Sequence, residues 1–288
     1  MKFESPEHAT ERSLKNPEYL HPLIVEAAIK AREVKKEEAI DPTIFESVYG
    51  QGAVVRDLEY VRSMKAKFGS ADEAHKKYAD VFEAVFYENA EMSNWLGENT
   101  HTIMTSEFDD IKNGMDVLVH LNDSARAFPY VGMGIDVTFG RNSVEKKINR
   151  IFGEIEKGKL GTVRYFMDPG YAQFKGELSG MPHIIVGVER RHVIELAGQW
   201  LRGEKRKLGE NPIQLVVLEQ IMAQLKAYRD YAEGLGRHDL AEIYDANISV
   251  FAPVLREKRG MDISDYKDDP VMTELTRALE ARKKQSKP

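Results

Sequence analysis

Two aspartates lie in short segments that are otherwise apolar, where a carboxylate is unusual. Asp116 lies in the segment 115–121, and Asp136 lies at the centre of the segment 130–139. Burying a carboxylate is unfavourable unless it is paired or binds a metal ion, so both residues are candidates for chemistry. The alternative is that each aspartate lies at a strand end in solvent or stabilises a turn.

Both segments have the composition of β-strands. They are rich in β-branched residues and are bounded by Asn-Gly, Asn-Asp-Ser and Gly-Arg-Asn, which are typical of turns. Residues 100–108 predict a preceding strand, and residues 109–114 predict a tight hairpin turn because Asn-Gly readily adopts positive φ. Two-residue alternation then places Asp136 and Thr138 on the same face of the third strand.

A long helix should precede these strands. Ser70 and Glu73 have the spacing of a capping box, and the helix they open is expected to end at Gly97 and to pack an apolar stripe on the sheet. On a helical wheel Glu88 falls at the edge of that stripe, whereas Glu83 falls near the opposite side. Glu88 is therefore a third candidate acid, although a flanking glutamate is more often a solvated residue.

Another helix should follow the strands, over residues 143–157. Ser143 is its expected N-cap, and Gly158 should end it. Lys147 flanks the apolar stripe of this helix, and Lys146 points away from it. We therefore expect Lys147 to point toward Asp136 and Lys146 to remain in solvent.

The remaining chain predicts an α/β fold, a small mixed sheet flanked by helices, with N-terminal helices and a C-terminal helical hairpin. We expect a region of helices at 1–69, an α/β core at 70–201, and a hairpin and tail at 202–288. The expected elements are a loose arm (1–20), helices (22–39, 54–68, 193–200), strands (161–167, 183–188), a Gly-rich loop (171–181), a basic linker (202–209), the hairpin helices (211–233, 238–258) and a tail helix (272–282).

Composition limits the chemistry. The chain has 288 residues and no cysteine, which excludes disulfides, thiolate metal sites and cysteine nucleophiles, so any metal should be hard and bound through oxygen. A net charge of −6 argues against a dedicated nucleic-acid binder but allows an enzyme that contacts the backbone locally. No apolar run is long enough to cross a membrane and no signal-peptide core is present, so we expect a cytoplasmic protein.

The order of helix, strand, strand beginning with Asp116, strand centred on Asp136, helix and strand resembles the PD-(D/E)XK nuclease superfamily. That family presents an acid from its first helix, an aspartate at its second strand and a (D/E)-x-K triplet on its third. Asp116 matches the first aspartate, Asp136-Val-Thr138 the triplet, and Glu88 the helix acid. The resemblance covers residues 70–188. It departs from the family pattern at Thr138, where the family usually has lysine. In some members of the family the following helix supplies this lysine, and Lys147 is placed to do so here.

The resemblance implies a restriction-endonuclease-like core and a Mg²⁺- or Mn²⁺-dependent nuclease acting on DNA. Asp116, Asp136 and Glu88 would be the metal ligands, and Lys147 would stabilise charge at the phosphate. A second hypothesis is a catalytically inactive nuclease-like module that serves as a structural or partner-binding protein. The C-terminal helices could mediate a homodimer.

Other motifs are weaker. His183, His192 and His238 lack the spacing of metal ligands, and Gly132-Met-Gly134 lies inside a strand with no helix opening after it. The basic clusters at 189–191 and 202–207 could contact a phosphate backbone or could simply be solvated.

Overall fold

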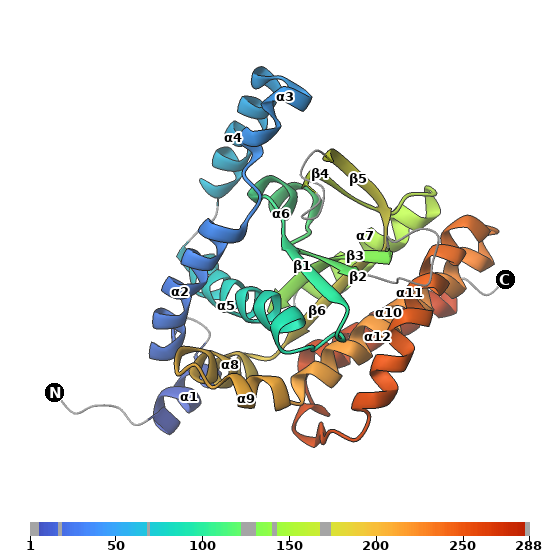
Figure 1. Cartoon of the computed structure of the whole chain (residues 1–288). Coiled ribbons are helices and arrows are strands. Elements are labelled where there is room, and N and C mark those ends of the chain that lie inside the picture. Colours follow the sequence, from blue (N-terminus) through green and yellow to red (C-terminus); the bar gives the residue numbers. More distant parts are fainter. Residues whose placement is uncertain are drawn as a thin grey trace.

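A mixed sheet lies at the centre of the computed structural model (Figure 1). Its four strands, in the order β1-β2-β3-β6, are β1 (Thr100–Met104), β2 (Val117–Leu121), β3 (Val131–Phe139) and β6 (His183–Val188). The pairs β1–β2 and β2–β3 are antiparallel, and β3–β6 is parallel. The structure describes residues 6–16, 19–67, 70–121, 131–139, 143–167 and 174–285. The mixed sheet flanked by helices, which the sequence predicted, is confirmed.

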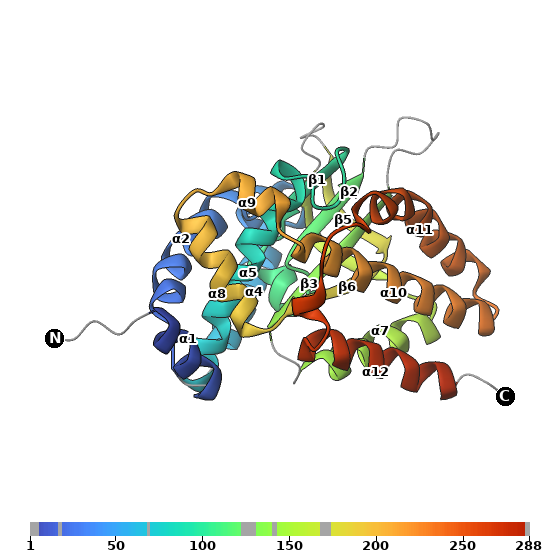
Figure 2. The same ribbon diagram turned by 90° about the horizontal axis from the view of Figure 1, so that it is seen from below.

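Helices cover the sheet on both sides (Figure 2). α5 (Ser70–Met92) packs on β1 and β3, and it is covered in turn by α2 (Pro22–Glu38) and α8 (Arg190–Leu201). On the other side lie α7 (Val144–Glu156), α10 (Ile213–Gly234) and α12 (Pro270–Gln285), with α11 (His238–Lys258) paired to α10 as the predicted helical hairpin. One hydrophobic cluster joins α2, α5, the sheet, α7 and the C-terminal helices, so all three expected regions share a core.

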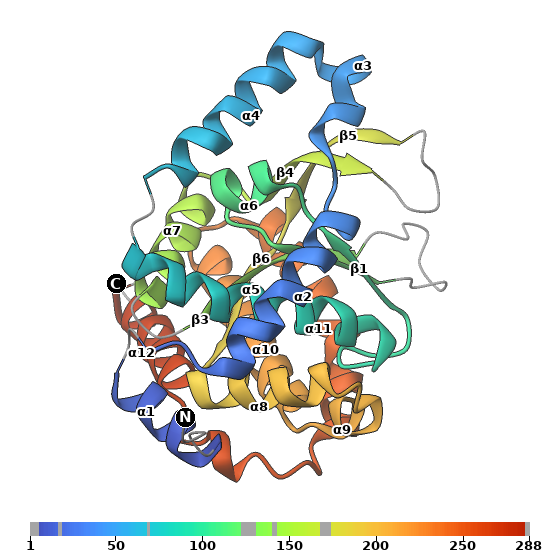
Figure 3. The same cartoon turned by 90° about the vertical axis from the view of Figure 1, so that its left-hand side faces the viewer.

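Shorter elements complete the fold. η1 (Pro42–Phe45), α3 (Glu46–Tyr49) and α4 (Gln51–Lys65) stand at one end of the molecule (Figures 1 and 3). Beside them, β4 (Gly161–Met167) and β5 (Lys175–Met181) form a separate antiparallel pair. The others are α1 (Pro6–Lys15), α6 (Glu107–Asn113), α9 (Lys205–Glu210) and η3 (Ser264–Tyr266).

The predicted hairpin turn at 109–114 is wrong, because α6 occupies this part of the chain. Ser106 Oγ accepts a hydrogen bond from the Asp109 backbone N–H at 3.1 Å and so caps the helix. The buried Asp109 carboxylate accepts bonds from the backbone N–H groups of Arg164 and Tyr165, which fixes α6 to β4. Gly114 does adopt positive φ (65°), but it does so as the left-handed residue that ends the helix.

Three further local predictions are wrong. Residues 175–181, expected in a loop, form strand β5; the predicted arm contains α1, and the predicted linker contains α9. Ser143 does occupy the N-cap position of α7, as predicted, but its hydroxyl makes no capping hydrogen bond and instead shares one with Thr138 Oγ1 at 2.9 Å. Residues 122–128, whose polar sequence predicts a connector between the second and third strands, lie outside the described residues.

The outer edge of β6 is closed by two glutamines of α10. Gln224 accepts from Ile185 N–H (2.9 Å) and donates to the carbonyl oxygen of the same residue (2.7 Å), and Gln220 does the same for Gly187 (2.9 and 2.7 Å). Both side chains are fully buried. Because an unpaired strand edge exposes backbone donors and acceptors, the C-terminal hairpin completes the sheet.

Candidate active-site cleft

Asp116 and Asp136 are neighbours across β2 and β3. The backbone N–H of Asp116 donates to the carbonyl oxygen of Ile135 (2.8 Å), and its carboxylate Oδ2 accepts from the backbone N–H of Val137 (2.6 Å). Asp116 is thus bonded to the residues immediately before and after Asp136. Both aspartates are buried, with 7% and 4% of their surfaces exposed.

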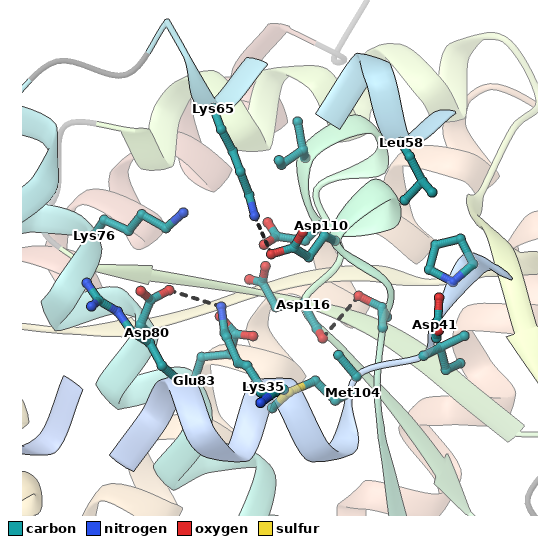
Figure 4. A pocket seen from close by; sticks show the side chains of 18 of the residues that line it. Lys35, Asp41, Leu58, Lys65, Lys76, Asp80, Glu83, Met104, Asp110 and Asp116 are labelled. Carbon is teal, nitrogen blue, oxygen red and sulfur yellow. Dashed lines mark hydrogen bonds and ion pairs between the residues drawn. The ribbon is translucent and has the colours of Figure 1, made fainter. Parts of the chain in front are cut away.

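A cleft of about 600 Å³ opens beside Asp116, between α2, α5 and α6 (Figure 4). Besides Asp116, its lining includes Asp80 and Glu83 from α5 and Asp110 from α6. We call these four residues the acid cluster. The Lys35 side chain enters from α2 and points toward them.

Lys35 is the nearest cation to the acid cluster. Its Nζ lies 2.6 Å from Glu83 Oε2 and 3.0 Å from Asp80 Oδ1. Burial alone would lower the pKa of Lys35, but the charges of Glu83 and Asp80 outweigh burial and raise its pKa well above the usual value. Lys35 is therefore a permanent ammonium ion in this cleft.

The acids retain protons more strongly than usual. Burial raises the pKa of Glu83 to about 7, although Lys35 opposes the shift. Burial also raises the pKa of Asp116 well above its usual value, and the charges of Glu83, Asp110 and Asp136 add to the effect. The cleft therefore has more buried carboxyl groups than Lys35 alone can compensate, and protonation relieves part of their mutual repulsion.

Asp136 has a different set of partners. Lys147 Nζ lies 2.5 Å from Asp136 Oδ1, and both His183 Nε2 and Arg150 Nη2 lie 3.8 Å from Oδ2. Burial would raise the pKa of Asp136, but Lys147 and His183 lower it below its usual value. Among the described residues that line the cleft, Asp136 is absent.

The predicted direction of Lys147 is confirmed, since its side chain reaches Asp136 while Lys146 is exposed. Thr138 helps to set this geometry. Its buried hydroxyl bonds to Ser143 at the start of α7, four positions before Lys147. A short tether thus holds α7 against β3 at the position where the nuclease pattern has lysine.

The structure does not bring Glu88 to the other candidates. Glu88 Oε2 accepts a hydrogen bond from Trp200 Nε1 of α8 at 2.6 Å, and the acid that α5 presents beside Asp116 is Glu83. The wheel assumed that α5 packs on the sheet alone, and it placed Glu83 on the exposed side. Because α2 covers that side, Glu83 is 5% exposed. One feature of the sequence could have identified Glu83: Asp80 and Glu83 are three positions apart and so lie on the same side of the helix.

Cations surround the acid cluster. The lining of the cleft also contains Arg32, Lys36, Lys65, Lys76 and Lys77. Lys65 pairs with Glu107, and Lys77 with Glu73, while Arg32 and Lys36 are exposed on α2. The cleft therefore combines an acidic interior with a basic margin.

Within the described ranges, no three His, Asp or Glu side chains are arranged to hold a metal ion together. Within the same ranges, no helix has both the length and the apolar character that a membrane crossing requires.

No protein-family model matches this sequence, and neither a curated protein nor a solved structure shows a match to it.

Proposed function

We propose that this protein is a metal-dependent nuclease that hydrolyses phosphodiester bonds of DNA at the cleft beside Asp116. One observation carries the proposal: Asp116 adjoins Asp136 across the strand pair and also opens into a cleft with an acidic interior and a basic margin. Such a cleft can hold a cation among carboxylates and a phosphate among lysines in the same place. The element order and the PD-(D/E)XK resemblance support the same function.

The donor set suits Mg²⁺ or Mn²⁺. The acid cluster offers oxygen atoms only, and Mg²⁺ is commonly held by one or two carboxylates together with water and substrate phosphate. Asp116 with Glu83 meets that requirement without a third protein ligand. A bound cation would polarise the phosphate and activate a water molecule.

The side chains of this chain have separate tasks in the proposed reaction. Asp116 would hold the cation together with Glu83, and Asp136, which does not line the cleft, would support Asp116 from the adjacent strand. Lys147 neutralises Asp136, while Lys36 and Lys76, which line the cleft, would hold the DNA backbone at its margin. Glu83, with a pKa of about 7, can exchange a proton near neutral pH.

Two measurements test the proposal: calorimetric titration of the protein with Mn²⁺, and a plasmid-cleavage assay. We expect the native protein to bind Mn²⁺ and cleave DNA. Asp116→Asn should weaken Mn²⁺ binding by about tenfold or more and reduce cleavage by about 10²-fold or more. Glu88→Gln is the matched control and should change neither quantity. A native protein that binds Mn²⁺ but cleaves no DNA would favour the second candidate function.

That second candidate is a nuclease-like module without catalysis, which serves as a structural or partner-binding protein. Thr138 favours it, because its hydroxyl is used to tether α7 and carries no charge. Under either function, the cytoplasmic location and the homodimer formed through α10 and α11 stay predictions. Sedimentation of the intact chain tests the homodimer.

A further inference from the structure

Lys35 reaches the acid cluster from outside the expected nuclease-like core. It lies on α2, whereas Asp80 and Glu83 lie on α5, and the contact exists because these two helices pack together. The Lys35 ammonium is in direct contact with both acids. Of its side-chain surface, 23% remains exposed, so the lysine has a route toward solvent.

The position of this ammonium is the one that a divalent cation would need. Both are attracted by the same buried carboxylates, and like charges at such short range repel strongly where water is scarce. Asp116 lies beside the pair and feels the charges of both Glu83 and Lys35. A cation bound by Asp116 and Glu83 would therefore require Lys35 to withdraw.

We propose that Lys35 is a built-in competitor for the divalent cation: its ammonium occupies the acid cluster in the resting protein, and cation binding displaces it. This inference rests on the proposed function, because it assumes that Asp116 and Glu83 hold a cation. The displaced ammonium moves to the mouth of the cleft, where the phosphate of bound DNA attracts it. Cation and DNA then favour each other's binding, since the DNA stabilises the displaced lysine.

Calorimetric titration with Mn²⁺ alone tests this competition without any activity measurement. Lys35→Met removes the competing charge and should tighten Mn²⁺ binding by about tenfold or more, the range in which one neighbouring charge changes proton affinity. Lys36→Met is the matched control, because Lys36 is the next residue on the same helix, lines the same cleft and is exposed. It should change Mn²⁺ affinity by less than about twofold.

A second variant addresses folding. Lys35→Gln keeps a hydrogen-bond donor for Glu83 without the charge, and the rise in its melting temperature on adding Mn²⁺ should exceed that of the native protein. Folded Lys35 variants that bind Mn²⁺ no more tightly than the native protein would overturn the competition and leave the proposed function intact. If neither the native protein nor the variants bind Mn²⁺, both the competition and the proposed cation site are refuted.

Discussion

Replacing Lys147 with alanine should destabilise the protein through Asp136. The Lys147 ammonium is the closest cation to a carboxylate that is 4% exposed. Removing one partner of a buried ion pair typically costs about 3–5 kcal/mol, because the other charge stays buried. His183 and Arg150 remain near the second oxygen, so we expect the low end of that range, about 3 kcal/mol.

The pH dependence identifies the cause of this loss. The pKa of Asp136 is lower in the folded protein than its usual value of 3.8. The ion pair of Asp136 therefore contributes its full stability above pH 3.8, and that contribution is lost as the pH falls through the pKa of the folded protein. The difference between the native protein and Lys147→Ala should therefore be complete at pH 7. It should shrink below about pH 4, as Asp136 becomes protonated.

Urea unfolding at pH 7 and at pH 3.5 measures both quantities. Lys146→Ala is the matched control, because this exposed neighbour carries the same charge on the same helix, and its effect should stay within about 0.5 kcal/mol. Equal losses for the two variants, or a Lys147→Ala loss that is the same at both pH values, would refute the role assigned to the Asp136 pair.

Two further predictions concern the sheet edge and the cleft. Gln224→Leu should leave the backbone N–H and C=O of Ile185 buried without partners, at a cost of about 2–5 kcal/mol in the free energy of unfolding by urea. Amide hydrogen exchange at Ile185 should also become faster. The control Lys226→Ala, at an exposed position on the same helix, should have almost no effect. Glu83 has a folded pKa of about 7 against a usual 4.5, so its contribution to stability is complete below pH 4.5 and is lost as the pH rises toward 7. Glu83→Gln should therefore gain stability relative to the native protein over that window, by up to about 3 kcal/mol, and a constant difference between pH 4.5 and 7.5 would contradict this.

The contact between Lys147 and Asp136 could be predicted from sequence because it depends on local rules. Strand alternation fixes the side to which Asp136 points, and the apolar stripe of the next helix fixes the direction of Lys147. Residues 131–139 and 144–156 follow each other closely in the chain. Few other arrangements of these two elements would bury both apolar faces.

The acid cluster could not be predicted in the same way, because Lys35 and Glu83 meet through the packing of α2 on α5. An amphipathic stripe shows that a helix buries one face, and it does not show that a second helix covers another. A helical wheel therefore puts Glu83 near the side opposite the apolar stripe. The hairpin error has a related origin, since Asn113-Gly114 can close a tight turn or end a helix. The capping bond that Ser106 Oγ accepts from the Asp109 N–H favours the helix.

Asp116 is the point at which two charge networks meet, and the networks come from opposite sides of the sheet. Asp136 and Lys147 belong to β3 and α7, whereas Lys35 belongs to a helix that the sequence assigned to a separate N-terminal region. A fragment of residues 70–201 would keep Asp116, Asp136, Glu83 and Lys147 but lose Lys35. Its buried acids would then lack their nearest ammonium ion, and the outer edge of β6 would lose Gln220 and Gln224. The elements that carry the nuclease pattern are therefore not sufficient to form the site, because its charge balance and its sheet both depend on helices outside them.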